Sequence, residues 1–556
     1  MSGWSGDLVV MGSGAAGLSA ALAARAAGLS VLVIEAADSI GGTTAVSGGV
    51  IWVPCNRHQR ARGISDSIQH ALEYLEHISE GRAPRRLIER YLTASPMMLD
   101  FVEDSIGVEF ECLDTYPDYQ PELPGGLTGG RSLDNPLYDT NRLGDWQPKL
   151  RKNPITGKAP MTIGEAMAWQ VFSKPLGFPF RDVYDRHKRG LVHGGAALIG
   201  RLLEACLARG IELRLQTRGR ELMRDDAGRV NGLRATDESG AVELTAQRGV
   251  VLASGGFAWN PELCKDFLLG VPTHPASVPT SRGDGLLMAM SAGAALGNMS
   301  QAWWCPAVEV PGEEYDGAPL YRPEFAARCL PHSVIVNASG QRFTAEATNY
   351  NDVTKPFFDH GPVGYRRKNL PAFLIVDQQY REKYALLSVP PVIPGIEPRP
   401  LPEWVKCADT LEALADRCGI DAATLVRSIE RFNHQAEAGD DTDFGRGRSA
   451  FDRFYGDPDQ LPNPNLGTLA KPPFYAVQLR PSTIGTKGGP KVDQHARVLR
   501  PDGSPIRGLY AAGNAMASIM GPGYPGAGAT IGVALTWGYL AGRHAAEGRK
   551  ERSSVE

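Results

Sequence analysis

The sequence lacks a surplus of basic residues, paired cysteine motifs and long apolar runs, and each absence excludes a class of protein. Its 58 Lys and Arg face 62 Asp and Glu, a formal net charge of -4, which argues against a nucleic-acid partner. The eight cysteines are scattered without a CxxC pair, so no metal site, iron–sulfur cluster or disulfide framework is expected. No window reaches the ~20 consecutive apolar residues that span a bilayer, and no basic-then-apolar leader opens the chain. We therefore expect a cytoplasmic protein.

Glycine, in contrast, is abundant, with 64 of the 556 residues. The glycines cluster in GG, GxG and GxGxxG strings without a three-residue period, which excludes collagen-like and low-complexity chains. We expect them to line ligands, because glycine lets the backbone come close to another group. A chain of this length is too long for one compact core, so two or more domains are expected.

The first of these strings predicts a dinucleotide-binding turn. Gly12, Gly14 and Gly17 follow an apolar strand at 7–11 and precede an Ala-rich helix at 18–27. In such a turn the first glycine permits the sharp bend, the second lets backbone amides reach a pyrophosphate, and the third allows close helix–strand packing. Glu35 ends the next strand, eighteen residues after Gly17, where a carboxylate accepts from ribose hydroxyls.

The fingerprint alone does not choose between NAD and FAD, so further strings must decide. Small-residue strings recur at 39–44, 253–256, 282–285 and 509–514, and a set spread over the whole chain suits the long cofactor FAD. No second complete GxGxxG occurs, so an NAD(P) site beside the flavin is unsupported. The string 526–532 also predicts a helix start whose free amides and dipole face the reduced flavin. Besides the fingerprint, the expected cofactor contacts are Ser13, Ala15, Ala16, Gly42, Thr43, Thr44, Ser47, Gly48, Gly49, Ser254, Gly255, Gly256, Asp284, Gly513, Asn514, Ala529, Thr530 and Ile531.

Changes of composition along the chain predict an α/β fold with a discontinuous first domain. We expect a Rossmann-type FAD-binding domain in two parts, 1–276 and 485–556, with an inserted α+β substrate and catalytic domain at 277–484. Residues 115–160, rich in Pro, Gly, Asp and Asn, predict a long ordered loop over a site or a flexible lid. Helical periodicity is expected at 68–78, 86–102 and 410–436.

Several longer strings carry a resemblance to a known family. The sequence resembles flavoproteins of the fumarate reductase and succinate dehydrogenase superfamily, and most of all the 3-ketosteroid Δ1-dehydrogenases, over nearly its full length. The strings that carry it are 41–52, 116–119 with 124–126, 451–457, 484–489 and 523–532. The resemblance implies an FAD-dependent oxidoreductase that acts on CH–CH bonds, and 41–49 contains no histidine for a covalent flavin, so FAD is expected to bind non-covalently.

The resemblance also implies the chemistry and its residues. A cyclic ketone, in the leading hypothesis a 3-ketosteroid desaturated at its 1,2 bond, gives a hydride to flavin N5 and its α-proton to a tyrosine. The resemblance places Tyr524 and Gly528 at the substrate's carbonyl and Tyr119 on the side of proton removal. The fourth residue is Tyr321, chosen over Tyr315 because the neighbouring stretch differs in length from the family. Two tyrosines suit the base side, because a phenol with a pKa near 10 needs a partner that stabilises the phenolate.

Other functions stay open at this stage. The same chemistry on a small alicyclic ketone such as cyclohexanone is one, because pocket walls and not the carbonyl clamp set substrate size. An enone or fumarate-type reductase is another, although the Arg and His arrangement of fumarate reducers has no convincing counterpart here. A flavin-binding module without turnover and a peripheral membrane protein that collects sterols complete the alternatives. As an enzyme, the protein would need a ketone or steroid substrate and an external electron acceptor.

Overall fold

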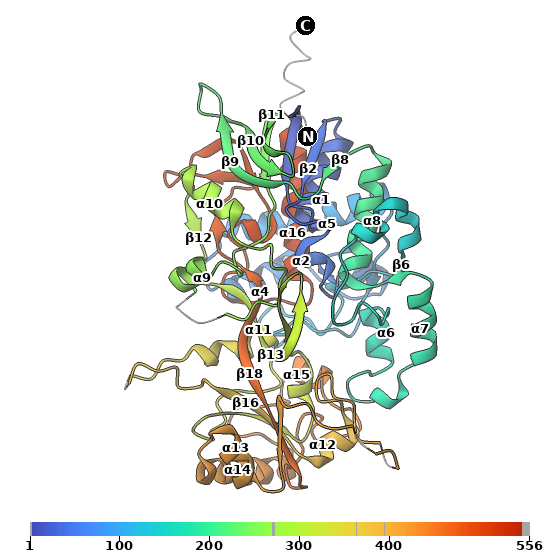
Figure 1. Ribbon diagram of the computed structural model, residues 1–556, viewed down its shortest axis with the longest axis vertical. Coiled ribbons are helices and arrows are strands. Elements are labelled where there is room, and N and C mark those ends of the chain that lie inside the picture. The colour runs from blue at the N-terminus through green and yellow to red at the C-terminus, as the bar shows by residue number, and fades with distance from the viewer. Residues whose placement is uncertain (1–2, 269–272, 363, 394, 398, 548–556) are drawn as a thin grey trace.

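The computed structural model describes residues 3–268, 273–362, 364–393, 395–397 and 399–547. The larger part of the molecule is built on an eight-stranded sheet (Figure 1). Five of its strands are parallel, and the antiparallel hairpin of β9 and β10 is attached where β10 pairs with β11. The path through this sheet is β20 (Arg497–Leu499), β21 (Pro505–Ala511), β11 (Gly240–Leu252), β1 (Trp4–Met11), β2 (Val31–Ile34) and β8 (Glu212–Arg214), with β10 (Val230–Asp237) and β9 (Arg218–Arg224) off it.

Helices α1 (Ala15–Ala26) and α16 (Ala529–Glu547) lie unusually close together in this part. A Cβ added at Gly538 would lie 2.2 Å from the carbonyl oxygen of Ala16, and one at Gly542 would lie 2.3 Å from that of Ala20. Small residues on both helices therefore allow the contact, which brings the C-terminal part of the chain against the N-terminal turn. The α/β fold predicted from the sequence is present, and its first sheet is assembled from both ends of the chain.

A second sheet of six strands forms the lower part of the molecule in Figure 1. Its hydrophobic residues alternate between two clusters: Val334 and Ile375 face one side, whereas Ile335 and Leu374 face the other. Helices α13 (Leu411–Cys418) and α14 (Ala422–Ala438) cover the first face. The strands are β14 (Ala318–Pro323), β13 (Ala302–Tyr315), β18 (Phe474–Thr486), β16 (Ala372–Val376), β15 (Ser333–Asn337) and β17 (Val405–Ala408).

Segment 284–297 contacts both parts of the molecule, because Leu286 belongs to a hydrophobic cluster that also holds Trp304 of β13. Helix α10 (Asp284–Ser291) contacts β9, and β12 (Leu296–Gly297) pairs with β19 (Gly489–Pro490). The second sheet itself begins with β13. The domain boundaries drawn from composition remain a prediction. The described strands of the second sheet begin within the predicted inserted domain 277–484, and β18 ends two residues beyond it.

The remaining elements surround these two sheets. Residues 115–160 include two short strands and a buried ion-pair group in which Arg131 joins Asp66 and Asp118, each at 2.7 Å. None of the helices in the described ranges has the length and apolar character needed to cross a membrane. The other helices and strands are α2 (Gly42–Ala45), β3 (Ile51–Trp52), α3 (Arg57–Ala61), α4 (Ile68–Ser79), α5 (Arg85–Asp100), β4 (Glu111–Cys112), β5 (Ser132–Asp134), β6 (Tyr138–Asp139), α6 (Ile163–Ala168), α7 (Phe180–Lys188), β7 (Leu191–Val192), α8 (Gly194–Ala208), α9 (Pro261–Phe267), α11 (Tyr350–Thr354), α12 (Gln378–Lys383) and α15 (Ala450–Phe454).

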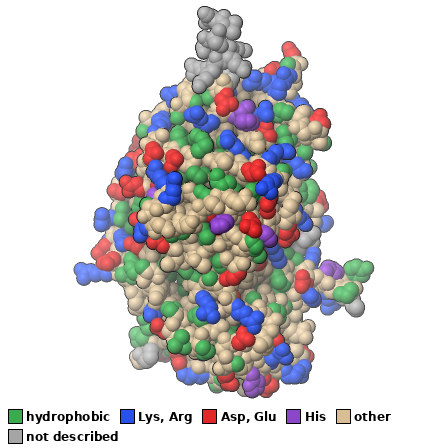
Figure 2. Space-filling view, turned by 180° about the vertical axis from the view of Figure 1, so that it is seen from behind, with side chains coloured by type: hydrophobic (Ala, Val, Ile, Leu, Met, Phe, Trp, Pro, Cys, Tyr) green, Lys and Arg blue, Asp and Glu red, His purple; other side chains and the backbone are tan. Residues whose placement is uncertain are grey.

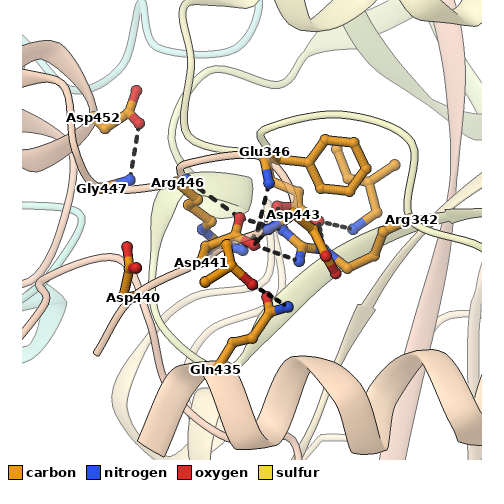
Figure 3. A network of polar contacts seen from close by, with 12 residues as sticks. Arg342, Glu346, Gln435, Asp440, Asp441, Asp443, Arg446, Gly447 and Asp452 are labelled. Carbon is orange, nitrogen blue, oxygen red and sulfur yellow. Dashed lines mark hydrogen bonds and ion pairs between the residues drawn. The ribbon is translucent and has the colours of Figure 1, made fainter. Parts of the chain in front are cut away.

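A network of buried charges ties the lower part to α15. Glu346 accepts hydrogen bonds from Arg342 at 2.7 Å and from Arg446 at 3.4 Å, and Asp441 pairs with Arg342 at 2.9 Å (Figure 3). All four side chains are at most 5% exposed. The loop that leads into α15 is therefore fixed by charge-assisted bonds in a low-dielectric interior.

Candidate active site

A cavity of about 710 Å³ is lined both by the turn after β1 and by a cluster of tyrosines. Most of the residues predicted to contact the cofactor line it: Gly12, Ser13, Gly14, Ala15, Ala16, Glu35, Gly42, Thr43, Thr44, Ser47, Gly48, Gly49, Ser254, Gly255, Gly256, Asp284, Gly513, Asn514, Thr530 and Ile531. Tyr119, Tyr524 and Gly528 line the same cavity. Gly17 and Ala529 lie outside the lining, and so does Tyr321.

The turn after β1 has the backbone that the fingerprint requires. Gly12 has a φ of +111°, and a Cβ there would lie 2.4 Å from the carbonyl oxygen of Ala253. A Cβ at Gly17 would lie 1.9 Å from the carbonyl oxygen of Gly12, so this glycine serves the close packing of α1 on the turn. The first amides of α1 lack partners within the helix, and Ala15 and Ala16 line the cavity, with the amide of Ala15 donating to the hydroxyl of Thr44 at 3.2 Å. This arrangement fits a pyrophosphate.

Glu35 has room for a further hydrogen bond. Its carboxylate accepts from the amide and hydroxyl of Ser13, at 3.1 and 2.6 Å, and from the amide of Ala37 at 3.0 Å. A carboxylate offers about four lone-pair positions, so one remains for a ribose hydroxyl. Asp284 is different, because both of its oxygens accept from Arg218, at 2.8 and 2.7 Å. Taken together, the glycine turn and the Glu35 acceptor fit FAD at this side of the cavity.

Three phenol rings meet on the other side of the cavity. The ring of Tyr524 lies 4.9 Å from that of Tyr119 and 5.5 Å from that of Tyr350. The hydroxyl of Tyr119 donates to the hydroxyl of Tyr350 at 2.9 Å, and Thr530 donates to the hydroxyl of Tyr524 at 3.0 Å. The amide of Tyr119 also donates to the carbonyl oxygen of Pro525 at 2.9 Å, which fixes Tyr119 next to Tyr524.

The structure places Tyr350, and not Tyr321, beside Tyr119. Tyr321 lies on β14 opposite Glu309, and its ring packs 5.0 Å from that of His274, outside the cavity lining. Tyr315 also lies elsewhere, with its hydroxyl 3.1 Å from Arg151. Tyr321 therefore does not meet Tyr119 in this structure, because β14 holds it in a β-hairpin, while α11 brings Tyr350 to the cavity. The signal for this helix start was Asn349, whose side chain caps the amide of Asp352.

Gly528 presents its backbone to the cavity. Its φ is +90°, and a Cβ there would lie 2.4 Å from the carbonyl oxygen of Val50, so only glycine fits this position. It lines the cavity together with Tyr524, four residues earlier in the chain. Tyr524 and Gly528 therefore line the same space.

Burial sets the protonation state of the three phenols. Loss of hydration raises the pKa of Tyr119 and of Tyr350 well above the usual value of 10.0, and it also raises the pKa of Tyr524. At Tyr350 the hydrogen bond from Tyr119 acts in the opposite direction and lowers the pKa. Hydrogen bonds from Thr530 and Tyr350 likewise lower the pKa of Tyr524, so an anion at Tyr350 would receive a hydrogen bond from Tyr119 and an anion at Tyr524 would receive one from Tyr350.

The remaining wall of the cavity is rich in apolar side chains. These residues are only partly buried in the protein itself, and Phe172 is 49% exposed. Apolar side chains that face a cavity in this way suit an apolar ligand. They are Met161, Ile163, Ala166, Met167, Val171, Phe172, Pro323, Phe325, Phe454 and Tyr455.

One group of possible metal ligands occurs within the described residues. His495, His544 and Glu547 offer ligand atoms that all lie within 4.8 Å of one another. None of them lines the cavity, and the hydroxyl of Tyr510 lies 3.0 Å from Nδ1 of His544. This group is therefore separate from the tyrosine cluster.

Comparisons with known proteins agree with this geometry. Residues 7–531 match the family described as FAD binding domain. The chain is 40% identical to 4-oxocyclohexanecarboxylate 2-dehydrogenase of Sinomonas cyclohexanicum, over 97% of this chain and 92% of that protein. It is 39% identical to 3-oxosteroid 1-dehydrogenase of Mycobacterium tuberculosis, over 97% of this chain and 98% of that protein. A crystal structure of 3-ketosteroid delta1-dehydrogenase from Sterolibacterium denitrificans, in complex with 1,4-androstadiene-3,17-dione, superposes with a TM-score of 0.90 at 37% identity, covering 98% of this chain and 100% of that one.

Proposed function

Because the chain belongs to the FAD-binding domain family, we propose that it desaturates a cyclic ketone beside its carbonyl. The leading candidate substrate is a 3-ketosteroid, desaturated at its 1,2 bond. FAD as cofactor is confirmed, and so is the predicted class, an FAD-dependent oxidoreductase acting on CH–CH bonds. The observation that carries the proposal is the pair of hydrogen bonds, Tyr119 to Tyr350 and Thr530 to Tyr524, in one cavity with the dinucleotide turn.

Removal of an α-proton needs a stabilised enolate oxygen. Because Thr530 donates to the oxygen of Tyr524, the hydroxyl proton of Tyr524 is free to point at the substrate's carbonyl. The Gly528 amide supplies the second donor. Donors fixed in this way typically contribute about 3–4 kcal/mol each to the transition state.

The base belongs on the other pair of phenols. In its phenolate form Tyr350 takes the α-proton and becomes a neutral phenol, and Tyr119 donates to its oxygen and so stabilises the phenolate before the transfer. Bound FAD supplies the acceptor for the hydride that leaves the β-carbon. The phenols are buried, so the proton is moved within a site that excludes water, where each of these hydrogen bonds is stronger.

The apolar wall supports a large substrate. Phe172, Phe325 and Phe454 extend the cavity surface beyond the tyrosines, which suits the fused rings of a steroid. A smaller alicyclic ketone is the second candidate, because the relative from Sinomonas cyclohexanicum is named for a monocyclic oxo acid and is as similar to this chain as the steroid enzymes.

The test is a substrate panel on the purified, flavin-loaded protein. A 3-ketosteroid and 4-oxocyclohexanecarboxylate are offered with an artificial dye acceptor, because the reduced flavin passes its electrons to an external acceptor. We expect turnover of the steroid with formation of the 1,2-unsaturated product. Turnover of the monocyclic acid alone would replace the steroid with the second candidate. Reduction of enones by the dithionite-reduced protein, without oxidation of either ketone, would overturn the proposal.

A further inference from the structure

Lys487 is a fully buried cation behind Tyr524. Its side chain is 0% exposed, and its Nζ donates to the carbonyl oxygens of Pro522 at 3.2 Å and Gly523 at 2.7 Å. These are the two residues that precede Tyr524. Among the residues that the structure describes, no carboxylate lies within ion-pair distance of the Lys487 ammonium. The carboxylate of Asp352 pairs instead with Lys355 at 2.7 Å.

The same ammonium also holds an aromatic ring against Tyr524. Nζ of Lys487 lies 4.2 Å from the centroid of the Trp303 ring, and the Trp303 ring lies 4.6 Å from the Tyr524 ring at an angle of 60°. The indole N–H of Trp303 donates to Asn514 at 3.0 Å, and Asn514 itself lines the cavity. Lys487 thus reaches Tyr524 by two routes, the main chain before it and the ring beside it.

This arrangement is costly for stability alone. Burial lowers the pKa of Lys487 well below its usual 10.5, which reflects the loss of hydration around the charged form. A buried cation without a carboxylate partner destabilises a fold relative to an apolar side chain of similar length. Two carbonyl acceptors and one aromatic face offset part of this cost, and all three belong to the surroundings of one hydroxyl.

We propose that Lys487 is a positioning residue, which fixes the Pro522 and Gly523 carbonyls and the Trp303 ring so that the hydroxyl of Tyr524 stays directed at the substrate's carbonyl oxygen. The inference rests on the proposed role of Tyr524 and extends it to a residue that does not itself touch the substrate. Lys487 belongs to the 484–489 string, so one residue of that string would keep Tyr524 in position.

The test uses the flavin-loaded enzyme with Lys487→Met, which keeps the length of the side chain and removes every donor. We expect a protein that retains its flavin spectrum while kcat falls about 10–100-fold, the size of effect that a small misplacement of a reacting group produces, with little change in KM. Lys487→Gln should recover part of kcat, because its amide can still donate to both carbonyls. Lys471→Met, at an exposed lysine paired with Glu382, is the control and should keep the wild-type rate.

A double-mutant cycle with Tyr524→Phe separates positioning from a general loss of stability. If Lys487 acts through Tyr524, Lys487→Met should cost no further activity in the Tyr524→Phe background. The proposal is overturned if the two losses multiply, if Lys487→Met keeps kcat within twofold of wild type, or if neither Lys487 variant folds. A fully active Tyr524→Phe single variant would instead contradict the proposed function itself.

Discussion

Tyr524 and Thr530 form the smallest unit on which the mechanism depends. Tyr524→Phe removes the hydroxyl that faces the cavity but keeps the ring packed against Trp303 and Tyr119. We expect the variant to fold and bind FAD, and kcat to fall about 10²–10³-fold, as for the loss of one fixed donor at a developing oxyanion. Steady-state rates with a dye acceptor measure this, and a wild-type kcat would remove Tyr524 from the mechanism.

Tyr350 is the proposed base, whereas Tyr321 lies outside the cavity lining. Tyr350→Phe should lower kcat by at least about 10²-fold, because it removes the base and leaves Tyr119 without its acceptor. Tyr321→Phe is the matched control on β14 and should leave kcat unchanged. The reverse result, an active Tyr350→Phe and an inactive Tyr321→Phe, would return the base to the hairpin.

Helix α15 shows how charges remote from the cavity support the site. Phe451 packs 4.9 Å from the Tyr119 ring, and the Tyr455 hydroxyl lies 2.6 Å from that of Tyr116. The loop before this helix is fixed by Arg446, which reaches Glu346 and the Ser333 carbonyl oxygen.

Glu346→Gln should therefore destabilise this part of the protein. The substitution leaves the Arg342 and Arg446 guanidinium groups with one negative partner fewer in a dry interior, and breaking a buried pair typically costs about 3–5 kcal/mol. Glu382→Gln, in an exposed pair with Lys471, is the control and should cost at most about 1 kcal/mol. Urea denaturation followed by fluorescence compares the two, and equal midpoints would contradict a stabilising role for the network.

Elements with strong local signals were predictable from the sequence, and pairings in space were not. The strand at 7–11 and the helix at 18–27 appear as β1 and α1, because an apolar run and a glycine turn are local features. The helical stretch 410–436 divides into α13 and α14 at Gly419, which has a φ of +68°. Tyr350 was missed because nothing near it in the sequence shows that α11 meets Tyr119, more than two hundred residues earlier.

At the scale of the whole molecule, charge is spread rather than gathered. Figure 2 shows Lys and Arg side chains interspersed with Asp and Glu over the face drawn, as the net charge of -4 leads one to expect. The molecule therefore depends on pH mainly through particular buried groups. Asp134 and Asp452 are the two carboxyls whose pKa burial raises from 3.8 to about 6.

Burial lowers the pKa of His193 from 6.5 to about 4, which makes the free energy of unfolding decrease as pH falls from 7 towards 5, whereas these two carboxyls make it increase. Their folded pKa lies above the unfolded value, so between 3.8 and about 6 the folded protein binds protons that the unfolded chain has released. Each group contributes at most about 3 kcal/mol. Although burial raises the pKa of Asp441, its interaction with Arg342 outweighs this effect, and the pKa is lowered overall. The stability that this carboxylate contributes is therefore lost only as the pH falls towards its folded pKa.

The measurement is the urea midpoint between pH 5 and 7 for the wild type, Asp134→Asn and Asp452→Asn. Between pH 7 and pH 5, the midpoint of each variant should move downwards relative to that of the wild type. Asp493→Asn, at a partly exposed carboxyl paired with Arg497, serves as the control and should follow the wild-type curve. A variant whose midpoint follows the wild-type curve over this range would contradict this assignment.

The account depends most on where the substrate's oxygen binds. The most direct measurement is a crystal structure of the FAD-loaded protein with a 3-ketosteroid or its dienone product. We predict the carbonyl oxygen within about 3 Å of both the Tyr524 hydroxyl and the Gly528 amide, with Tyr350 beside the α-carbon. A carbonyl oxygen held by other residues, with Tyr524 turned away from it, would contradict the account.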